Sequence, residues 1–180
     1  ADAIKADAKA TIAGLKARGI RTIMLTGDSR AVGEAVGKEI GIDEVHSELL
    51  PQDKVTKLEE VLASKRKGEK VIFVGDGIND TPVLARSDIG MAMGGLGSDA
   101  AIEAADIVIM DDQPSKILTA MDVAKETRKI VWQNIIFAMA VKGVFLILGA
   151  FGVATMWEAV FADVGVTVLA VLNSIRILKK

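Results

Sequence analysis

The sequence predicts an α/β domain with a parallel sheet, followed by a hairpin of two membrane-spanning helices. Apolar β-type runs alternate with helix-type segments up to about residue 129, a pattern typical of parallel sheets covered by helices. The remainder is strongly apolar, and from residue 130 to residue 178 its only charges are Lys142, Glu158, Asp163 and Arg176. The change in composition at Lys129 therefore predicts a domain over residues 1–129 and a hairpin over residues 130–180.

Charge and cysteine content exclude several functions. The formal net charge is only −2, so the chain lacks the broad basic surface of a nucleic-acid-binding domain, and no nucleic-acid partner is expected. The chain has no cysteine, which excludes disulfides and thiolate metal sites within it. The only histidine, His46, has no second ligand nearby and is interpreted as a surface or turn residue rather than a metal ligand.

The first 50 residues predict a helix, a strand, a helix and an extended stretch. Apolar residues and alanines at helical spacing end at Gly19, and the β-type run Ile20–Leu25 follows. Small residues predict a helix from Ser29 to about Ile40. A short extended stretch is expected over Val45–Leu49.

Later segments predict more strands of the same sheet. Pro51 suits the first turn of a helix, because its fixed backbone and missing N–H are tolerated there. The run Lys70–Val74 predicts the next strand, and Ile89–Met93 and Ile107–Met110 predict two further short strands. A helix beginning near Ser98 is expected between the last two strands.

The run Val71–Pro82 is the most informative segment for function, because it joins a strand to a turn rich in polar side chains. The turn presents Asp76, Asn79 and Asp80 together. Ligands bind at the carboxyl ends of strands in open α/β sheets, and two carboxylates with a carboxamide suit Mg²⁺ and a phosphoryl group. The alternative is an ordinary turn, which Asp-Gly and Asn-Asp pairs also favour.

Two further polar segments are expected at strand ends. Thr26, Gly27 and Asp28 follow a strand and precede a helix, where a hydroxyl and backbone N–H groups face an anion. The alternative is an ordinary helix N-cap by Asp28 or Ser29. Lys54 lies in the first turn of the Pro51 helix, where a cation is unfavourable unless an anion compensates it. Its alternative is a solvated surface lysine.

These three segments, in this order, resemble the haloacid-dehalogenase-like phosphotransfer fold, and specifically the phosphorylation domain of P-type ATPases. The resemblance continues through Thr81-Pro82, the segment Met91–Gly97 and the segment Ser98–Ala101. It covers essentially all of residues 1–129. It implies a haloacid-dehalogenase-like Rossmannoid parallel sheet.

The resemblance implies roles for the first two polar segments. Thr26 and Gly27 would hold phosphoryl oxygens, and Lys54 would neutralise the charge of the phosphate and of an aspartyl group. Asp28 would lie near the nucleotide, with ATP as the substrate. Such residues position and stabilise the transferred group more than they do covalent chemistry.

The resemblance also implies a Mg²⁺ cofactor at the third segment. Asp76 would ligate Mg²⁺, and Asn79 and Asp80 would complete the phosphate and metal environment, with Asp80 also contributing to the cofactor site.

The sequence departs from this family in one decisive respect. The nucleophile of the family is the first Asp of an Asp-Lys-Thr-Gly-Thr motif, and no such motif occurs here. The actuator domain, the nucleotide-binding domain and the earlier transmembrane segments of the family also lie upstream of the matched region. The chain is therefore expected to be the C-terminal part of a longer pump, to need that missing portion as its partner, and to be inactive alone. Loss of the central nucleophile strand should leave unpaired sheet edges and marginal stability.

Residues 130–180 predict two transmembrane helices, over about 130–155 and 157–178. Each stretch is long enough to cross a bilayer and is apolar almost all round, which favours membrane spans over the alternative of two buried core helices. A short turn near residues 154–158 makes the pair antiparallel. Basic residues flank both ends: Lys125, Arg128, Lys129, Arg176, Lys179 and Lys180. The chain is therefore expected in a plasma or inner membrane as a multi-pass protein, with its soluble part cytoplasmic and the lipid bilayer as a partner.

Lys142 and Asp163 are charged residues inside these apolar stretches. Charges there cost roughly 2.5 to 3.5 kcal/mol each and usually face a pathway or a partner. Lys142 lies about 18 Å and Asp163 about 22 Å from the same edge at 1.5 Å per residue. The two side chains are therefore expected to meet as an ion pair, with a purely structural pair as the alternative role.

The hairpin also narrows the resemblance to one branch of the family. Lys142 in the penultimate helix and Asp163-Val164-Gly165 in the last resemble the zinc, cadmium and lead exporting P-type ATPases. This implies that Asp163 binds the transported Zn²⁺, Cd²⁺ or Pb²⁺ and that Lys142 is a built-in counter-charge. The expected function is therefore part of an ATP-driven metal exporter. The alternatives are a membrane-tethered haloacid-dehalogenase-like phosphatase and a non-catalytic or regulatory fragment.

Overall fold

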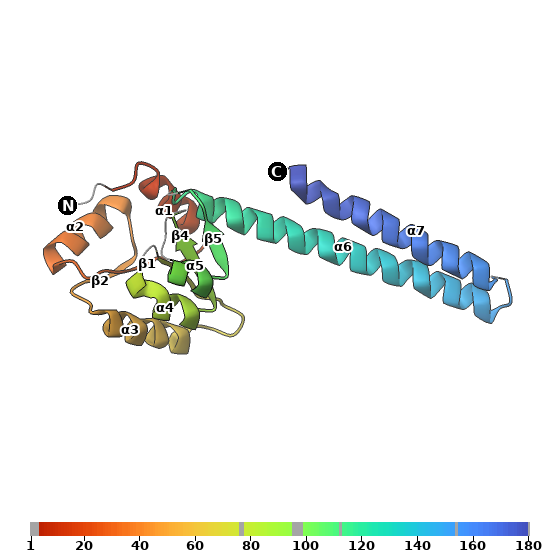
Figure 1. Ribbon diagram of the computed structural model, residues 1–180, viewed down its shortest axis with the longest axis horizontal. Helices are drawn as coiled ribbons and strands as arrows, with labels where there is room; N and C mark the ends of the chain where they lie inside the picture. Colours follow the sequence, from red (N-terminus) through yellow and green to blue (C-terminus); the bar gives the residue numbers. More distant parts are fainter. Residues whose placement is uncertain (1–3, 76–77, 95–98, 112, 154, 180) are drawn as a thin grey trace. The chain divides into compact units, whose positions relative to one another are not determined.

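The computed structural model describes residues 4–75, 78–94, 99–111, 113–153 and 155–179 (Figure 1). Two compact units divide the chain, residues 1–118 and residues 119–180. The first is an α/β unit and the second is a pair of long helices.

The first half of the α/β unit follows the predicted order of elements. It contains, in chain order, α1 Ala8–Ala17, β1 Ile23–Leu25, α2 Arg30–Ile40, β2 Glu44–His46 and α3 Pro51–Ser64. β1 and β2 pair in parallel, with Ile23 opposite Glu44 and Leu25 opposite His46. Pro51 begins α3, as its restricted backbone predicts.

The second half contains a three-stranded parallel sheet in the order β3-β4-β5. Its elements are β3 Ile72–Gly75, the 3₁₀ helix η1 Ile78–Asp80, α4 Thr81–Arg86, β4 Ile89–Met93, α5 Asp99–Ala104 and β5 Ile107–Ile109. The predicted strands and the helix near Ser98 are confirmed. The short helix α4 was not predicted from the sequence.

The sheet is divided into two parts. Among the described residues β1 pairs only with β2, and β3 pairs only with β4, so β1 and β3 each have one edge without a strand partner. The incomplete parallel sheet predicted from the sequence is therefore confirmed. Unpaired edges of this kind are templates for pairing with another strand.

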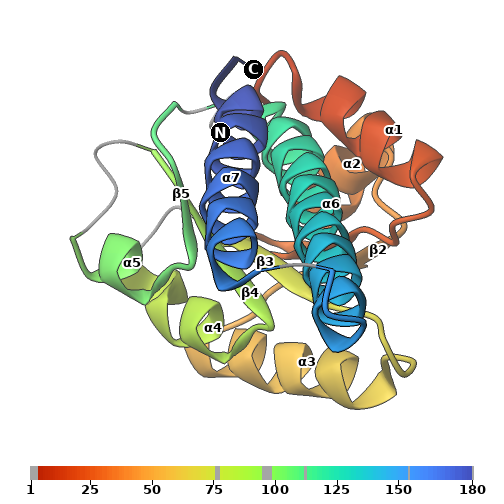
Figure 2. The ribbon, with the colours of Figure 1, turned by 90° about the vertical axis from the view of Figure 1, so that its right-hand side faces the viewer.

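Helices cover both faces of the strands. α3 and α4 lie on one side, and α1 and α2 lie on the other (Figures 1 and 2). The best-buried side chains of this unit include Val83, Leu84 and Met91. Burying a side chain such as Leu84 contributes about 1.5 to 3 kcal/mol. Gly90 permits this packing, because an added Cβ would lie 2.8 Å from the backbone oxygen of Leu84.

Two carboxylates tie the strand starts to neighbouring elements. Asp88 accepts hydrogen bonds from Lys65 Nζ at 2.6 and 2.7 Å and from the Val71 backbone N–H at 2.9 Å. Asp43 is bound by Lys16 Nζ at 2.7 Å and by the N–H and hydroxyl of Thr22. The ammonium of Lys65 and the Val71 N–H lower the pKa of Asp88 to about 2.

The second unit consists of α6 Lys116–Ala150, α7 Met156–Ile175 and the 3₁₀ helix η2 Arg176–Lys179. α6 begins within the first unit and continues without a break past Lys129, so the change in composition falls inside a helix. Thr155 caps α7, and its backbone N–H and side chain bind the carboxylate of Glu158. The two helices are long and apolar enough to cross a membrane.

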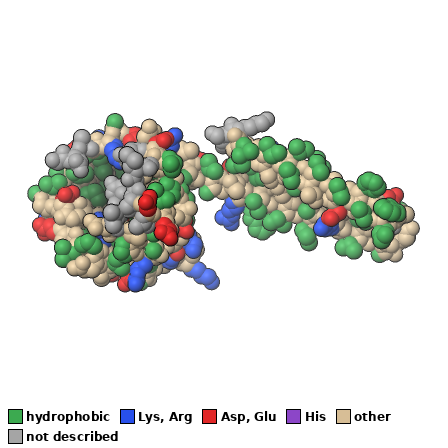
Figure 3. Space-filling model, in the orientation of Figure 1, with side chains coloured by type: hydrophobic (Ala, Val, Ile, Leu, Met, Phe, Trp, Pro, Cys, Tyr) green, Lys and Arg blue, Asp and Glu red, His purple; other side chains and the backbone are tan. Residues whose placement is uncertain are grey.

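Exposed apolar side chains cover the hairpin (Figure 3). Ile136, Met139 and Leu146 have exposed fractions of 62%, 67% and 74%. Among the described residues from 119 onward, only Ile130 and Val166 are buried. Such continuous apolar exposure is typical of a surface that lies in lipid.

Replacing Asp88 by Asn should destabilise the α/β unit in a pH-dependent way. The pKa of Asp88 in the folded state, about 2, lies below its ordinary value of 3.8. The ionised carboxylate therefore stabilises the fold above about pH 4, and this contribution is lost as the pH falls toward 2. Urea unfolding of the chain in detergent, followed by far-UV circular dichroism, should show the largest difference between the two proteins above pH 5.

The matched control for this prediction is Glu39→Gln, which alters an exposed carboxylate on α2. It should leave the urea midpoint nearly unchanged across this pH range. An Asp88→Asn midpoint equal to that of the unaltered chain at pH 7 would contradict the stabilising role of Asp88.

Candidate functional site

A partly buried ion pair joins α3 to η1. Lys54 Nζ lies 2.8 Å from Asp80 Oδ1, and the two side chains are only 18% and 13% exposed. Lys54 is in the first turn of α3, where the helix dipole disfavours a cation. Asp80 supplies the compensating anion that the sequence required, so Lys54 is not a solvated surface lysine.

Asp80 lies over the carboxyl end of β3. An added Cβ on Gly75 would lie 3.0 Å from Asp80 Cβ and 3.1 Å from Asp80 Oδ2. A larger residue at Gly75 would therefore push this carboxylate away from the strand end. Asn79 is in η1 and exposed, whereas the predicted ligand Asp76 lies outside the described residues.

Thr26 and Asp28 form a compact turn at the carboxyl end of β1. The Thr26 hydroxyl donates to Asp28 Oδ2 at 2.9 Å and accepts from the Asp28 backbone N–H at 3.1 Å. Ser29 is the N-cap residue of α2, and no side-chain hydrogen bond caps that helix. The N-cap position expected for Ser29 is therefore confirmed, but its side chain does not cap the helix.

The segment between β2 and α3 holds this turn in place. The backbone N–H groups of Glu48 and Leu49 donate to the carbonyl oxygens of Asp28 and Thr26 at 2.8 and 3.1 Å. Glu48 has a φ of 60°, a left-handed conformation that is costly for a residue with a side chain. The same segment leads directly into α3 and Lys54.

The structure thus places the described residues of the predicted phosphoryl-transfer site at the carboxyl ends of β1 and β3 and at the start of α3. Lys54 contacts Asp80, and Thr26 contacts Asp28. Within the described residues no hydrogen bond joins these two pairs directly. Instead, Leu49 donates its backbone N–H to the Thr26 carbonyl oxygen and leads along the chain into α3, which carries Lys54. The carboxyl ends of parallel strands are where α/β proteins bind ligands.

Sequence reasoning did not give Thr81 a role of its own. Its hydroxyl oxygen is buried and has no hydrogen-bond partner among the described residues. Buried polar atoms without partners are rare in folded proteins and point to a missing ligand or water. The only sequence signal was its place directly after Asp80 in the resembling segment.

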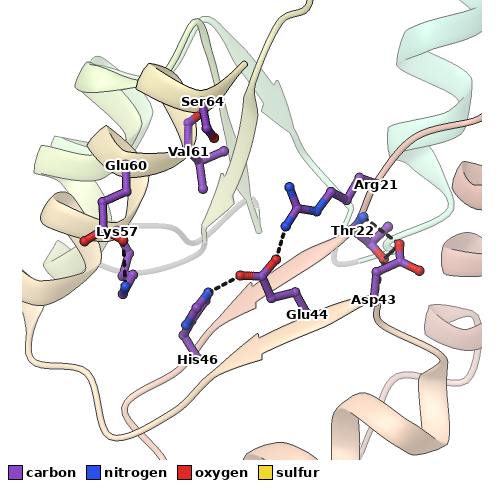
Figure 4. Close-up of polar contacts among 9 residues, drawn as sticks. All are labelled: Arg21, Thr22, Asp43, Glu44, His46, Lys57, Glu60, Val61 and Ser64. Carbon is purple, nitrogen blue, oxygen red and sulfur yellow. Dashed lines mark hydrogen bonds and ion pairs between the residues drawn. The ribbon is translucent and has the colours of Figure 1, made fainter. Parts of the chain in front are cut away.

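A further polar network lies on the β1-β2 sheet (Figure 4). His46 Nε2 lies 2.7 Å from one carboxylate oxygen of Glu44, and Arg21 pairs with the other oxygen. The hydrogen bond from His46 and the charge of Arg21 lower the pKa of Glu44. His46 lies in the strand β2 and not in a turn, and its side chain is 26% exposed.

The hairpin contains the ion pair expected from the depths of its charged residues. Lys142 Nζ lies 3.0 Å from Asp163 Oδ1. The two side chains are 58% and 59% exposed, so packing against the rest of the hairpin does not hold them together. Charged groups in such helices are usually functional because their insertion is costly.

The donor atoms fit a phosphoryl group and a hard cation in part. The Asp80 carboxylate and the orphaned Thr81 hydroxyl are adjacent in the chain, and oxygen donors are what Mg²⁺ prefers. Among the described residues no three His, Cys, Asp or Glu side chains gather into a metal-binding group. Neither the Asp80 region nor Asp163 is therefore a complete metal site within the described part of the chain.

Comparison with known proteins gives a consistent result. A family model for haloacid dehalogenase-like hydrolases matches residues 1–88. The chain is 68% identical over 180 residues to a cadmium, zinc and cobalt-transporting ATPase of Bacillus subtilis, and 56% identical to a zinc-transporting ATPase of Synechocystis. Each alignment covers 99% of this chain but only 26% and 25% of the relative.

A solved structure also matches the chain, over residues of both units. The crystal structure of a zinc-transporting PIB-type ATPase in an E2.Pi state matches with a TM-score of 0.89 and 36% identity, over 98% of this chain and 28% of that one. The two apolar helices fit the membrane-spanning part of these proteins, and the α/β unit lies on the cytoplasmic side. The chain is therefore similar along its whole length to P-type ATPases, and it spans about a quarter of the length of the metal-transporting proteins that it matches.

Proposed function

We propose that this chain forms part of an ATP-driven exporter of divalent heavy-metal ions, with zinc, cadmium and lead as the class of cargo. The observation that carries the proposal is the presence of two charged pairs in one chain. Lys54 and Asp80 form one pair at a strand end, and Lys142 and Asp163 form the other inside an apolar hairpin. A pump needs both a phosphoryl-transfer site and an ion site in its membrane part.

The Lys54–Asp80 pair suits a site at which a phosphoryl group is transferred. The ammonium of Lys54 would stabilise negative charge that builds up on the phosphoryl oxygens, and the Thr26-Gly27 backbone would orient the same group. Asp28 would lie near the nucleotide, with ATP as the phosphoryl donor. Bound Mg²⁺ would neutralise phosphate charge, held by Asp80 and Asp76 with Asn79 nearby.

The nucleophile would come from a strand that is not in this chain. The free edges of β1 and β3 each offer unpaired backbone groups, and both strands end at predicted site residues. A strand carrying the Asp-Lys-Thr-Gly-Thr motif would pair with them and bring its aspartate to the site. The partner is thus the upstream portion of the same pump, with its actuator, nucleotide-binding and earlier transmembrane segments.

Asp163 would bind the transported ion together with ligands from upstream helices. A carboxylate suits Zn²⁺ among the metals of this class. Lys142 competes with the ion for the same carboxylate, because its ammonium already lies 3.0 Å from Asp163. Once the ion has left, the ammonium of Lys142 would re-pair with Asp163 and disfavour rebinding.

Replacing Lys54 by Ala in the longer pump should lower phosphoenzyme formation from ATP by about 100-fold, since one charge-stabilising group at a transfer site has effects of this size. Acid-stable phosphoenzyme measured with radiolabelled ATP would test this. Lys57→Ala is the matched control, because Lys57 lies one turn further along α3 and pairs with Glu60. Equal phosphoenzyme levels in the two variants would remove Lys54 from the site.

Replacing Asp163 by Ala should abolish zinc-stimulated ATP hydrolysis while phosphorylation by inorganic phosphate survives. The substitution removes the ion site but leaves the cytoplasmic residues intact. Both activities would be measured on the purified pump in detergent. Glu158→Gln, in the first turn of α7 and five residues before Asp163, serves as the control. Zinc stimulation that persists in Asp163→Ala would show that Asp163 does not bind the ion.

A further inference from the structure

Five polar residues meet across the hairpin at the end opposite the α6–α7 turn. This cluster, here called the carboxamide clamp, consists of Gln133 and Asn134 on α6, Asn173 and Ser174 on α7, and Arg176 at the start of η2. None of these residues was singled out as functional by its sequence. The clamp lies away from the Lys142–Asp163 pair along both helices.

Asn134 and Asn173 are the central members of the clamp. The Asn134 side-chain N–H₂ donates to the Ala170 carbonyl oxygen at 3.1 Å and to the Ser174 hydroxyl oxygen at 3.0 Å. The Asn173 N–H₂ donates to the Asn134 amide oxygen at 2.8 Å, and Arg176 donates to the Asn173 amide oxygen at 2.9 Å. The carboxamides therefore bond to each other and to the opposite helix.

Both asparagines lie on the seam along which the two helices face each other. From residue 130 onward, the less exposed positions other than Gly143 recur at coiled-coil spacing, at 130, 134, 138, 141, 145 and 148 on α6 and at 162, 166, 170, 173 and 177 on α7 and η2. Asn134 and Asn173 occupy seam positions in this pattern. A single polar residue at such a position is known to specify the register of paired helices.

Apolar packing alone does little to fix how α6 is aligned along α7. Only Ile130 and Val166 are buried among the described residues from 119 onward. Within lipid, helix association depends on packing and interhelical hydrogen bonds, because lipid tails are as apolar as the side chains. A slide of one helix past the other would exchange one exposed aliphatic contact for another, but it would break the bonds of the clamp.

The clamp and the ion pair share one register. Asn134 is eight positions from Lys142, about 12 Å along α6, and Ala170 is seven positions from Asp163, about 10 Å along α7. The clamp therefore holds the two helices so that the charged side chains arrive at the same depth. A slip of one helical turn, about 5.4 Å, would separate them.

We infer that the carboxamide clamp is a positioning element that sets the register of α6 and α7 and so places Lys142 against Asp163. The inference rests on the proposed function in one respect, because the ion pair matters for transport only if the chain serves a pump. The register itself is a property of this hairpin. Asn134 and Asn173 act through the ion pair and do not contact the transported ion.

Disulfide formation tests the register directly, because the chain has no native cysteine. Ala138→Cys with Val166→Cys reports the observed register between the clamp and the ion pair. Ala138→Cys with Ala162→Cys reports a slip of one turn in one direction, and Val141→Cys with Ala170→Cys reports a slip of about one turn in the other. Each pair would be oxidised in the 180-residue chain in lipid nanodiscs, with and without Asn134→Leu and Asn173→Leu.

With the clamp intact, the 138/166 pair should be oxidised at least several times faster than either slipped pair. With both asparagines replaced, this preference should be lost. Ile136→Leu, at an exposed position on α6, should leave the preference unchanged. An unaltered preference in the double variant would overturn the inference. If the double variant loses its helical circular dichroism, Asn134→Ala alone gives the same comparison, because it removes both donated bonds.

A second readout separates positioning from mere stability. In the longer pump, Asn134→Leu should raise the zinc concentration for half-maximal ATP hydrolysis by about tenfold, with the phosphoenzyme level from inorganic phosphate unchanged. Asn134→Gln, which keeps the carboxamide, should restore part of the loss. An unchanged zinc requirement in Asn134→Leu would overturn the inference. If the double variant loses the register preference but the unaltered pump shows no zinc-stimulated ATP hydrolysis, the inference about the clamp holds. Only the proposed function is then refuted.

Discussion

The division of the sheet is the constraint on which the rest of this structure depends. β1 pairs with β2 and β3 pairs with β4, but within the described residues no strand lies against the other edges of β1 and β3. Thr26 and Asp28 follow β1 and Asp80 follows β3, so the place where ligands bind in α/β proteins is also the place where the sheet is open. The proposed chemistry at this site would therefore depend on a strand from outside the chain.

Charged and polar side chains hold the geometry where backbone pairing or apolar packing does not. Lys54 and Asp80 connect the start of α3 to the end of β3, and an ion pair between Glu59 and Arg86 connects α3 to α4 nearby. In the hairpin, carboxamides and one ion pair link helices whose apolar side chains are mostly exposed. Such groups give direction to an interface, since hydrogen bonds and ion pairs depend on geometry and apolar burial does not.

Much of the fold and part of the site followed from the sequence, for identifiable reasons. The strands and most helices have strong periodic patterns, and the misplaced charge of Lys54 required a partner that proved to be Asp80. α4 was missed because six residues are too few for a helical period to show. The start of α6 was not predicted, because the change in composition at Lys129 marks where the chain becomes apolar and not where the helix begins. The clamp was missed because uncharged Asn134 and Asn173 stand out only when their partners are seen.

Amide hydrogen exchange of β1 and β3 tests the central claim most directly, that an outside strand completes the site. Exchange would be measured by mass spectrometry on the 180-residue chain and on the longer pump, with β4, which has partners on both sides, as the internal reference. The claim predicts that β1 and β3 exchange at least about tenfold more slowly in the pump, equivalent to about 1.4 kcal/mol of protection, while β4 changes little. Equal exchange of β1 and β3 in the two proteins would contradict it.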